Sequence, residues 1–202
     1  MVEYENTSYK EEYMEELPIY HGTSIKKADK IISENKMHYN PKPDHWLGNG
    51  IYFFENDYDA AKWWSKIHFH DNWIVLKYNL KIGEKELIDL DTLHGSKKFK
   101  EFCKKVNVEM GKDEFKIKIS EKENRYINAS KNPKICRQRI VTSAYLSAFY
   151  NLNHYKACVK SFCISAFNDL SILHFESRER QMFIIDSSMI NCKNLKKIRN
   201  NV

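Results

Sequence analysis

The sequence predicts an α+β fold built on a mixed β-sheet, and three observations support this expectation. Segments rich in β-branched and aromatic residues outnumber the long segments with helical periodicity, and the helices fall between them at irregular intervals. A doubly wound parallel sheet would instead alternate strands and helices regularly. A length of 202 residues suits one domain that buries its own core.

The first quarter of the chain is expected to hold two strands, a helix and a loop. Residues 17–21 form a short extended run that stops at Gly22. Ser24 is placed to cap a helix whose apolar residues recur at helical spacing. Residues 37–49 are rich in Pro, Asn and Gly, which are typical of a loop. Residues 50–54 then predict a strand by their β-branched and aromatic content.

The remaining elements follow from capping and periodicity. Asp57 is placed to cap a helix that extends to about residue 68, and alternating apolar residues predict a strand over residues 73–82. Helices are predicted near residues 97–106 and over residues 135–152. Three strand-like runs finish the chain, at residues 156–165, 181–186 and 189–196.

The overall composition is that of a globular protein. Hydrophobic residues make up 42% of the chain and charged residues 30%. No apolar run approaches the roughly 20 residues that a transmembrane helix needs. The first residues, Met1-Val-Glu-Tyr-Glu5, lack the basic and apolar regions of a signal peptide. We therefore expect a cytoplasmic protein that does not bind membranes.

The net charge of +6 is distributed unevenly along the chain. Residues 1–16 contain six acidic residues and one lysine, so the remainder carries a net charge of about +11. A basic body attracts nucleic acid, acidic proteins or phosphates, but a lysine-rich solvated surface accounts for the same charge. Arg137 and Arg139, in the helix predicted over residues 135–152, can be interpreted in the same two ways. They form either an edge that contacts phosphates or a solvated helix face.

Cysteine and histidine spacing gives no metal signature. The five cysteines are scattered without a CxxC pair, so we expect reduced thiols. His68 and His70 form an HxH pair, which by itself is a weak signal for a zinc site. The sequence therefore predicts no metal cofactor.

Two motifs in the first third of the chain carry chemistry when they occur together. Tyr20-His-Gly-Thr23 places a histidine at the end of a strand, before a glycine that lets the backbone approach a ligand. About thirty residues later, Gly48 and Gly50 precede Tyr52, and a helix rich in Ala and Trp follows at once. Each motif alone is usually a turn or part of a core, so the information lies in their order and spacing.

This arrangement resembles the poly(ADP-ribose) polymerase and diphtheria-toxin branch of the ADP-ribosyltransferases, which carries a His-Tyr-Glu set. The resemblance covers residues 19–64 closely, with a shorter match at residues 178–186. It implies the ADP-ribosyltransferase fold, with split mixed β-sheets flanked by helices around an NAD cleft. The acidic segment 1–16 would precede a single catalytic domain of residues 17–202.

The resemblance implies a role for each matching residue. His21 would hydrogen-bond a ribose hydroxyl of NAD⁺, and Gly22 would offer its backbone N–H and C=O to the nicotinamide carboxamide. Thr23 completes the motif and is assigned to the NAD contacts with them. Tyr52 would stack on the nicotinamide ring, and Trp63 matches the position of a second aromatic that would sandwich it.

The late segment departs from the family pattern. In Arg178-Glu-Arg-Gln-Met-Phe-Ile-Ile-Asp186, Gln181 stands where the family has its catalytic Glu. Strand alternation would place Glu179 on the same face as Gln181. We therefore assign Glu179 as the catalytic or substrate-activating carboxylate and Gln181 as the ribose contact. The alternative is that Glu179 only pairs with Arg178 or Arg180 at the surface.

The resemblance implies an NAD⁺-consuming mono-ADP-ribosyltransferase of the small kind found among toxins and phage-defence effectors. It would transfer ADP-ribose to a macromolecule and release nicotinamide. The basic body slightly favours nucleic acid, RNA or DNA, over protein as the acceptor. An enzyme of this kind, free in its own cell, suggests a neutralising antitoxin partner.

Three other functions fit parts of the same sequence. An NAD⁺ glycohydrolase would use the same site with water as the acceptor. A non-catalytic module that binds NAD⁺ or a partner protein would explain Gln181 at the expected Glu position. An RNA 2′-phosphotransferase would also consume NAD⁺, but its basic His/Arg constellation is not evident here.

Overall fold

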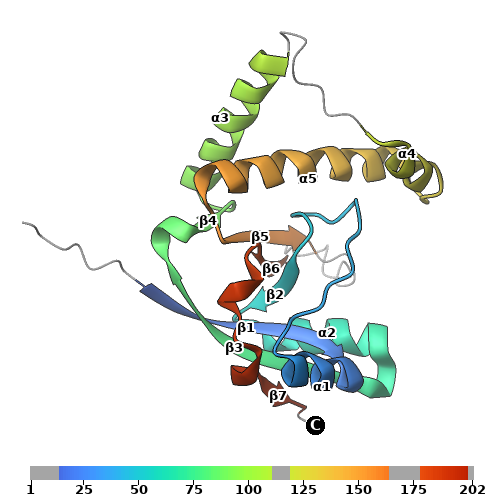
Figure 1. The fold of residues 1–202 in the computed structure, drawn as a ribbon, viewed down its shortest axis with the longest axis vertical. Coiled ribbons are helices and arrows are strands. Elements are labelled where there is room, and N and C mark those ends of the chain that lie inside the picture. The colour runs from blue at the N-terminus through green and yellow to red at the C-terminus, as the bar shows by residue number, and fades with distance from the viewer. Residues whose placement is uncertain (1–13, 111–118, 164–177, 200–202) are drawn as a thin grey trace, which may run out of the picture.

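The computed structural model describes residues 14–110, 119–163 and 178–199, and it has mixed α and β structure (Figure 1). Seven strands form one mixed sheet in the order β4–β5–β6–β2–β1–β3–β7. Neighbouring strands are antiparallel, except that β4 and β5 are parallel. The α+β class and the mixed sheet predicted from the sequence are confirmed.

The elements are bounded as follows. The strands are β1 Met14–Ser24, β2 Ile51–Glu55, β3 Trp73–Gly83, β4 Leu87–Asp89, β5 Ala157–Cys163, β6 Arg178–Ile184 and β7 Lys196–Ile198. The α-helices of the described residues are α1 Ile25–Glu34, α2 Tyr58–Phe69, α3 Leu93–Met110, α4 Glu121–Asn128 and α5 Pro133–Asn153.

Local capping signals place the first two helices where the sequence predicts them. The Ser24 side chain accepts a hydrogen bond from the Lys27 N–H at the start of α1. The Asp57 carboxylate accepts from the Ala60 N–H at 2.8 Å at the start of α2. The start of β1 is longer than expected, because its pairing with β3 extends back to Met14. The boundary at residue 16 between an acidic segment and the domain therefore falls inside β1, and residues 1–13 lie outside the described part.

The strand predicted over residues 189–196 is wrong. Two 3₁₀ turns, Ser187–Met189 and Cys192–Asn194, occupy half of this segment, and only its last residue belongs to a strand. Each turn is preceded by a residue whose side chain, Asp186 or Asn191, accepts a hydrogen bond from the backbone N–H two residues later. Such local hydrogen bonds compete with strand pairing. Strand β7, which follows the second turn, pairs with β3.

Helix α4 was not predicted from the sequence, although the sequence contains a capping signal for it. Ser120 and Glu123 form a reciprocal capping box at the start of α4: the Ser120 hydroxyl accepts from the Glu123 N–H, and the Glu123 carboxylate accepts from the Ser120 N–H. The pattern Ser-x-x-Glu predicts a helix start in any sequence. The lysine-rich composition before it obscured this signal.

The expectation of split sheets is wrong, because all seven described strands belong to one continuous sheet. Strand β2 pairs with β6 over residues 51–54 and thereby joins the two halves into one hydrogen-bonded sheet. The β1–β2 register, by contrast, contains only Ile19 and Tyr20 of β1. Beyond Tyr20 these two strands no longer pair. We refer to this unpaired stretch as the opening between β1 and β2.

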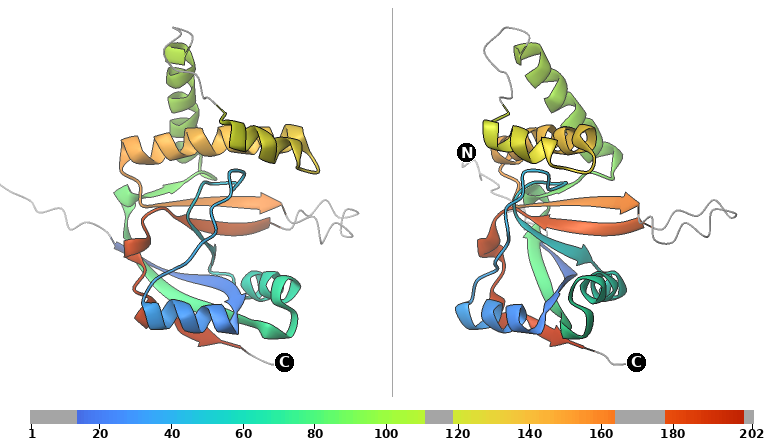
Figure 2. Two further views of the ribbon diagram at one scale, coloured as in Figure 1. Left: turned by 45° about the vertical axis from the view of Figure 1, so that its right-hand side comes forward. Right: turned by 90° about the vertical axis from the view of Figure 1, so that its right-hand side faces the viewer.

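Helices cover both faces of the sheet (Figures 1 and 2). On β2, Ile51 and Phe53 belong to the buried cluster that packs against α1. Phe54 belongs to the cluster beneath α2, whereas Tyr52 joins the cluster beneath α5. Because Tyr52 and Phe54 are two residues apart on one strand, they share a face. Helices α2 and α5 therefore cover adjoining parts of the face opposite α1.

The connection between α1 and β2 extends from the lower helices up to α5 (Figures 1 and 2). Its Asp44 carboxylate accepts a 2.8 Å hydrogen bond from the Tyr126 hydroxyl of α4. Its Trp46 indole lies against the Phe162 ring of β5, with centroids 4.8 Å apart. The loop that follows the His-Gly-Thr motif is thus tied to the second half of the chain.

Of the helices that the structure describes, none is both long and apolar enough to cross a membrane.

Candidate functional site

Three segments that are distant in the sequence lie on neighbouring strands. Strand β1 pairs with β2, and β2 pairs with β6, so the motifs around residues 21, 52 and 179–181 lie side by side (Figure 1). Phe54 is directly opposite Gln181 in the register, and Tyr52 is opposite Phe183. Tyr52, Glu179 and Gln181 therefore share the face covered by α2 and α5. The His21 side chain lies on the opposite face, against Phe53 in the cluster that packs with α1.

The His21 side chain connects β1 to β2 beyond their last paired residues. Its Nδ1 lies 2.8 Å from the Tyr52 carbonyl oxygen. A carbonyl oxygen can only accept, so Nδ1 carries the proton and donates. Burial lowers the pKa of His21, and the positive charge of Lys27 lowers it further. The imidazole is therefore neutral near pH 7, and its Nε2 is a hydrogen-bond acceptor.

Gly22 places backbone polar groups at the same opening. The Pro18 carbonyl accepts from the Asn56 N–H across the β1–β2 edge. Backbone groups alternate between the two edges of a strand, so Gly22, four residues later, directs its N–H and C=O to this edge. The β1–β2 register ends at Tyr20, two residues before it. Gly22 therefore presents a donor and an acceptor beyond the end of the pairing.

Helix α2 accounts for a glycine at this position. A Cβ on residue 22 would lie 2.4 Å from the Ala61 carbonyl oxygen and 2.9 Å from the Ser65 Cβ. Both are far closer than van der Waals contact. The close approach of α2 to β1 thus requires the absence of a side chain at Gly22.

Tyr52 is held at both ends. Its hydroxyl accepts from the Leu47 N–H and donates to the Gly48 carbonyl, each at 2.9 Å. Its ring lies 5.1 Å from the Phe183 ring. Burial raises the pKa of the Tyr52 hydroxyl, so it stays neutral. Tyr52 therefore fixes the end of the loop to β2, besides standing at the predicted ligand position.

The adjacent tryptophans of α2 have different surroundings. Trp64 stacks on His68 with ring centroids 4.1 Å apart and belongs to the cluster beneath α2. Trp63, the predicted sandwich partner, is partly exposed at the neighbouring position of the helix. The Thr23 side chain is 3% exposed, so it is part of the packing rather than of the surface.

Glu179 and Gln181 lie together on one face of β6, as strand alternation predicts. The Gln181 amide donates to a Glu179 carboxylate oxygen. Burial and the negative charge of Asp57 raise the pKa of Glu179, and the Gln181 hydrogen bond offsets part of that rise. Partly buried carboxyl groups with raised pKa values are frequent at functional sites.

The raised pKa of Glu179 predicts a stability change with pH. Between the unfolded and the folded pKa, the folded state binds more protons than the unfolded state, so stability falls as pH rises above about 4.5. Glu179→Gln removes this dependence. Relative to the wild type, its free energy of unfolding should rise as the pH increases from about 4.5 to the raised pKa of the folded state and stay constant above it, with a slope of at most about 1.4 kcal/mol per pH unit. Urea unfolding between pH 4.5 and 8 measures the difference; parallel curves would contradict it.

Arg180 was not singled out by the sequence analysis except as a surface partner of Glu179. Its guanidinium instead forms ion pairs with Glu55 at 2.5 Å, Asp89 at 2.7 Å and Asp91 at 3.2 Å. These carboxylates come from the end of β2, from β4 and from the residues after β4. Arg180 thus connects β6 to β2 on one side and to the β4 region on the other. No local sequence pattern predicts these ion pairs.

Among the described residues, no group of three or more His, Cys, Asp and Glu side chains is placed to hold a metal ion.

Comparison with known proteins gives little that bears on this geometry. No protein-family model matches the chain. A stretch of 96 residues is 31% identical to an uncharacterized protein of Methanocaldococcus jannaschii, and it covers 45% of this chain and 45% of that protein. No solved structure matches. The chain thus spans under half the length of this relative, whose name carries no activity.

Proposed function

We propose that the protein is an NAD⁺-dependent mono-ADP-ribosyltransferase. The observation that carries the proposal is the adjacency, in one sheet, of the strands β1, β2 and β6 that contain His21, Tyr52 and the pair Glu179–Gln181. The resemblance in the sequence assigns these residues to one NAD site. These strands come from segments about thirty and about 130 residues apart in the sequence and are neighbours in the sheet.

The residues at the β1–β2 opening suit the nicotinamide end of NAD⁺. A carboxamide has one donor and one acceptor group, which complement the C=O and N–H of Gly22. The His21 Nε2, which accepts, suits a ribose hydroxyl that donates. Two or three such contacts would hold the nicotinamide ribose in a fixed orientation. A fixed orientation lowers the entropic part of the activation barrier.

The residues on β6 suit the charge that develops in the reaction. When the bond between the ribose C1′ and nicotinamide breaks, nicotinamide leaves neutral with the bonding electrons and positive charge builds on the sugar. The Glu179 carboxylate would stabilise that charge and accept the proton of the acceptor nucleophile. The Gln181 amide would hydrogen-bond the ribose without adding charge, which favours a single transfer over chain elongation.

The physiological setting we propose is that of a toxin or phage-defence effector with a neutralising antitoxin partner. The acceptor is a macromolecule, with nucleic acid favoured by the basic charge of residues 17–202. Substrate water in place of a macromolecule would make the protein an NAD⁺ glycohydrolase, and the experiment below separates the two.

Nicotinamide release from NAD⁺ tests the proposal directly. The purified protein is incubated with NAD⁺, with and without added RNA, DNA or lysate protein. We expect release that depends on an added polymer and falls about 100-fold in His21→Ala, the usual scale for losing one group that stabilises a transition state. The matched control is His38→Ala, because His38 is exposed and pairs with Glu34.

Each other outcome leads to a different function. Release that needs no acceptor but is lost in His21→Ala would make the protein a glycohydrolase. Equal release by the His21→Ala and His38→Ala variants would show that the catalytic site does not lie on these strands. A folded protein that binds NAD⁺ without any release would be a non-catalytic module, with Gln181 as the reason.

A further inference from the structure

A pocket of about 570 Å³ lies beneath α5, beside the proposed NAD site. This volume falls within the range of about 300–1,000 Å³ that is typical of small-molecule sites. Its walls come from the loop before β2, from α3, from α5 and from β5. The residues that line it are Trp46, Leu47, Leu90, Ser96, Phe99, Lys100, Ile135, Gln138, Arg139, Thr142, Leu146, Lys160 and Phe162.

Two aromatic rings that line the pocket contact each other. Trp46 and Phe162 meet edge to face, with centroids 4.8 Å apart. The Arg139 guanidinium lies over the Trp46 ring at 4.0 Å. Trp46 nevertheless remains 50% exposed, which is unusual for so large an apolar side chain. An exposed indole held in place by a cation and a second ring offers a fixed surface for stacking.

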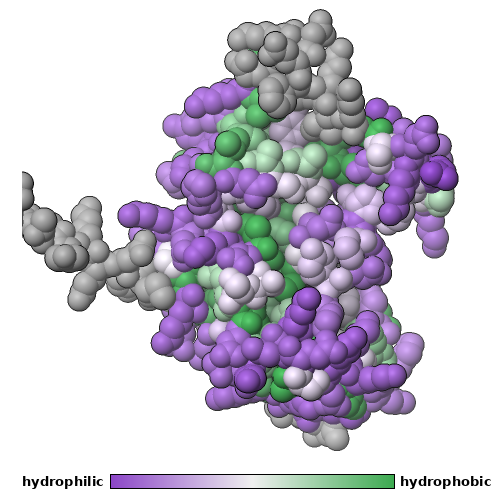
Figure 3. Space-filling view, in the orientation of Figure 1, coloured by the Kyte–Doolittle hydropathy of each residue, from purple (hydrophilic) through white to green (hydrophobic). Residues whose placement is uncertain are grey.

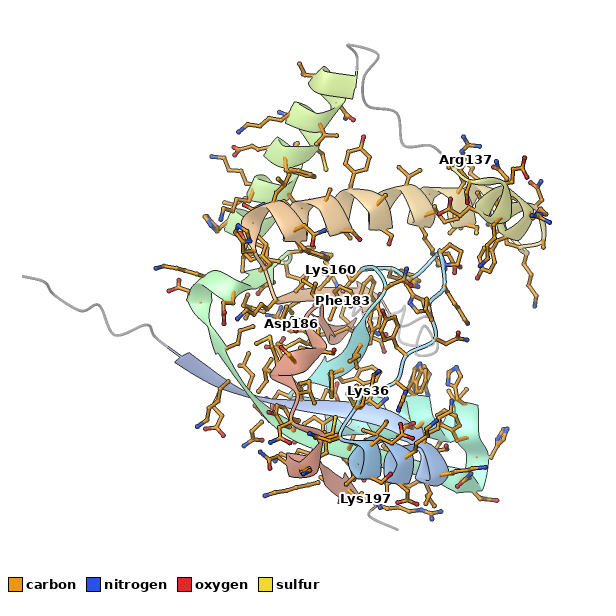
Figure 4. The ribbon with its side chains drawn as sticks, viewed as in Figure 1. Lys36, Arg137, Lys160, Phe183, Asp186 and Lys197 are labelled. Atoms are coloured by element: carbon orange, nitrogen blue, oxygen red, sulfur yellow. The ribbon has the colours of Figure 1, made fainter. Side chains whose placement is uncertain are left out.

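The charged side chains that line the pocket are cationic. Among the described residues that line it, Lys100, Arg139 and Lys160 are cationic and none is acidic. Lys160 extends from β5 beneath α5 (Figure 4), where Asp91 holds its ammonium group at 2.6 Å. Figure 3 shows apolar residues exposed down the middle of this view, with hydrophilic residues on either side of them. Apolar stacking surface surrounded by cations suits a nucleobase with its phosphates.

The pocket adjoins the proposed catalytic pair through the strand register. Phe162 of β5 is directly opposite Glu179 of β6, and Lys160 is directly opposite Gln181. Side chains of directly opposite residues share a face, with Cβ atoms about 4.5–5.5 Å apart. The wall of the pocket is therefore one strand away from the residues assigned to the nicotinamide ribose. The Leu47 N–H, on the other wall, binds the Tyr52 hydroxyl.

We propose that this pocket holds one nucleotide of a single-stranded nucleic acid, the acceptor of the ADP-ribose. The base stacks at Trp46 and Phe162, and the flanking phosphates lie against Lys100, Arg139 and Lys160. A single strand is required because a base inside a duplex cannot reach a pocket of this kind. This inference rests on the proposed function for the transfer step, but the binding itself does not.

The transfer step exchanges one bond at the ribose C1′ for another. A lone pair on the base or sugar of the bound nucleotide forms a bond to the ribose C1′ while the bond from C1′ to nicotinamide breaks. Nicotinamide leaves neutral, and the proton of the attacking group passes to the Glu179 carboxylate. The position of Phe162 opposite Glu179 places the acceptor nucleotide on the side of the ribose where this proton transfer occurs.

Binding of a labelled oligonucleotide in the absence of NAD⁺ tests the pocket by itself. Fluorescence anisotropy is measured with a short single-stranded RNA, the matching DNA and the duplex. We expect single strands to bind more tightly than the duplex. Trp46→Ala should weaken binding about 5- to 150-fold, because stacking is worth about 1–3 kcal/mol per base.

Arg139→Ala has a matched control on the same helix. Arg137 is two residues earlier in α5, is exposed, and is not among the lining residues. We expect Arg139→Ala to weaken binding at least about 5-fold more than Arg137→Ala, since only Arg139 holds the indole. Circular dichroism verifies that the variants are folded. Equal losses in both arginine variants, or no loss in Trp46→Ala, would overturn the proposal and leave only nonspecific attraction to a basic surface.

Three outcomes distinguish failure of this inference from failure of the proposed function. If single strands bind through Trp46 but no nicotinamide is released, the pocket stands and the transferase function fails. If nicotinamide is released and the label appears only on protein, with Trp46→Ala fully active, the function stands and the pocket proposal fails. If NAD⁺ competes with the oligonucleotide and Trp46→Ala raises the KM for NAD⁺, the pocket belongs to the adenosine half of NAD⁺ and the proposal is also overturned.

Discussion

Gly22→Ala is expected to reduce nicotinamide release at least about 100-fold and to lower the free energy of unfolding by about 1–3 kcal/mol. The added Cβ would lie 2.4 Å from the Ala61 carbonyl oxygen, so α2 and β1 would have to move apart. That movement would displace the Gly22 backbone groups and Trp63 of α2 relative to each other. A displacement of about 1 Å is sufficient to cost two orders of magnitude in rate.

The cause of this effect can be tested with a second substitution. The severe contact is with the backbone oxygen of Ala61, and the contact with the Ser65 Cβ, at 2.9 Å, is secondary. Gly22→Ala combined with Ser65→Gly should therefore not recover activity, because no side-chain truncation removes a carbonyl. Thermal unfolding and nicotinamide release are measured for both variants. Recovery in the double variant, or a Gly22→Ala protein with wild-type stability, would show that α2 does not approach β1 this closely.

Arg180→Ala is expected to lower the free energy of unfolding by about 2–3 kcal/mol. The substitution leaves Glu55, Asp89 and Asp91 close together without the cation that they share. A fully buried pair that loses one partner costs about 3–5 kcal/mol and an exposed pair at most about 1 kcal/mol. The Arg180 side chain is 36% exposed, so an intermediate value is appropriate.

Conservative and control variants show whether geometry or charge is responsible. Arg180→Lys keeps the charge but cannot reach three carboxylates with a single ammonium group, so it should recover less than half of the loss. The exposed Arg137→Ala should change stability by less than about 0.5 kcal/mol. Urea unfolding at neutral pH measures all three variants. If Arg180→Ala and Arg137→Ala were equally mild, the ion pairs of Arg180 would be solvated surface contacts.

Local chemistry accounts for the parts of the fold that the sequence predicts correctly. Ser24 and Asp57 cap α1 and α2 through hydrogen bonds to backbone groups three residues away. The long helix α5 begins at Pro133 after an Asn132 cap, close to its predicted start. In each case the deciding interaction lies within one helical turn, so a window of sequence contains it.

The errors have an equally definite origin. Residues 189–196 have the apolar content of a strand, but the hydrogen bonds from Asp186 and Asn191 to nearby backbone N–H groups produce turns instead. The extension of β1 back to Met14 depends on pairing with β3, a segment about sixty residues later. Whether an extended run becomes a strand is decided by its neighbour, which no local window reveals.

The candidate site divides along the same line. Strand alternation is a local rule, and it placed Glu179 and Gln181 on one face. The adjacency of β6 to β2 and β5 is a tertiary fact, and it sets Phe54, Lys160 and Phe162 around that pair. The ion pairs of Arg180 and the pocket beneath α5 belong to the same category, because their members come from segments far apart in the chain.

By itself, the sequence determined the α+β class, the capped helices and the residue types that form the candidate site, because these depend on periodicity and on interactions within a few residues. Only the tertiary structure decided the single seven-stranded sheet and the opening between β1 and β2. It also decided the ion pairs of Arg180 and the pocket beside Glu179. Strand order and register depend on pairing between distant segments, and their energy comes from contacts that form only when the whole sheet is assembled.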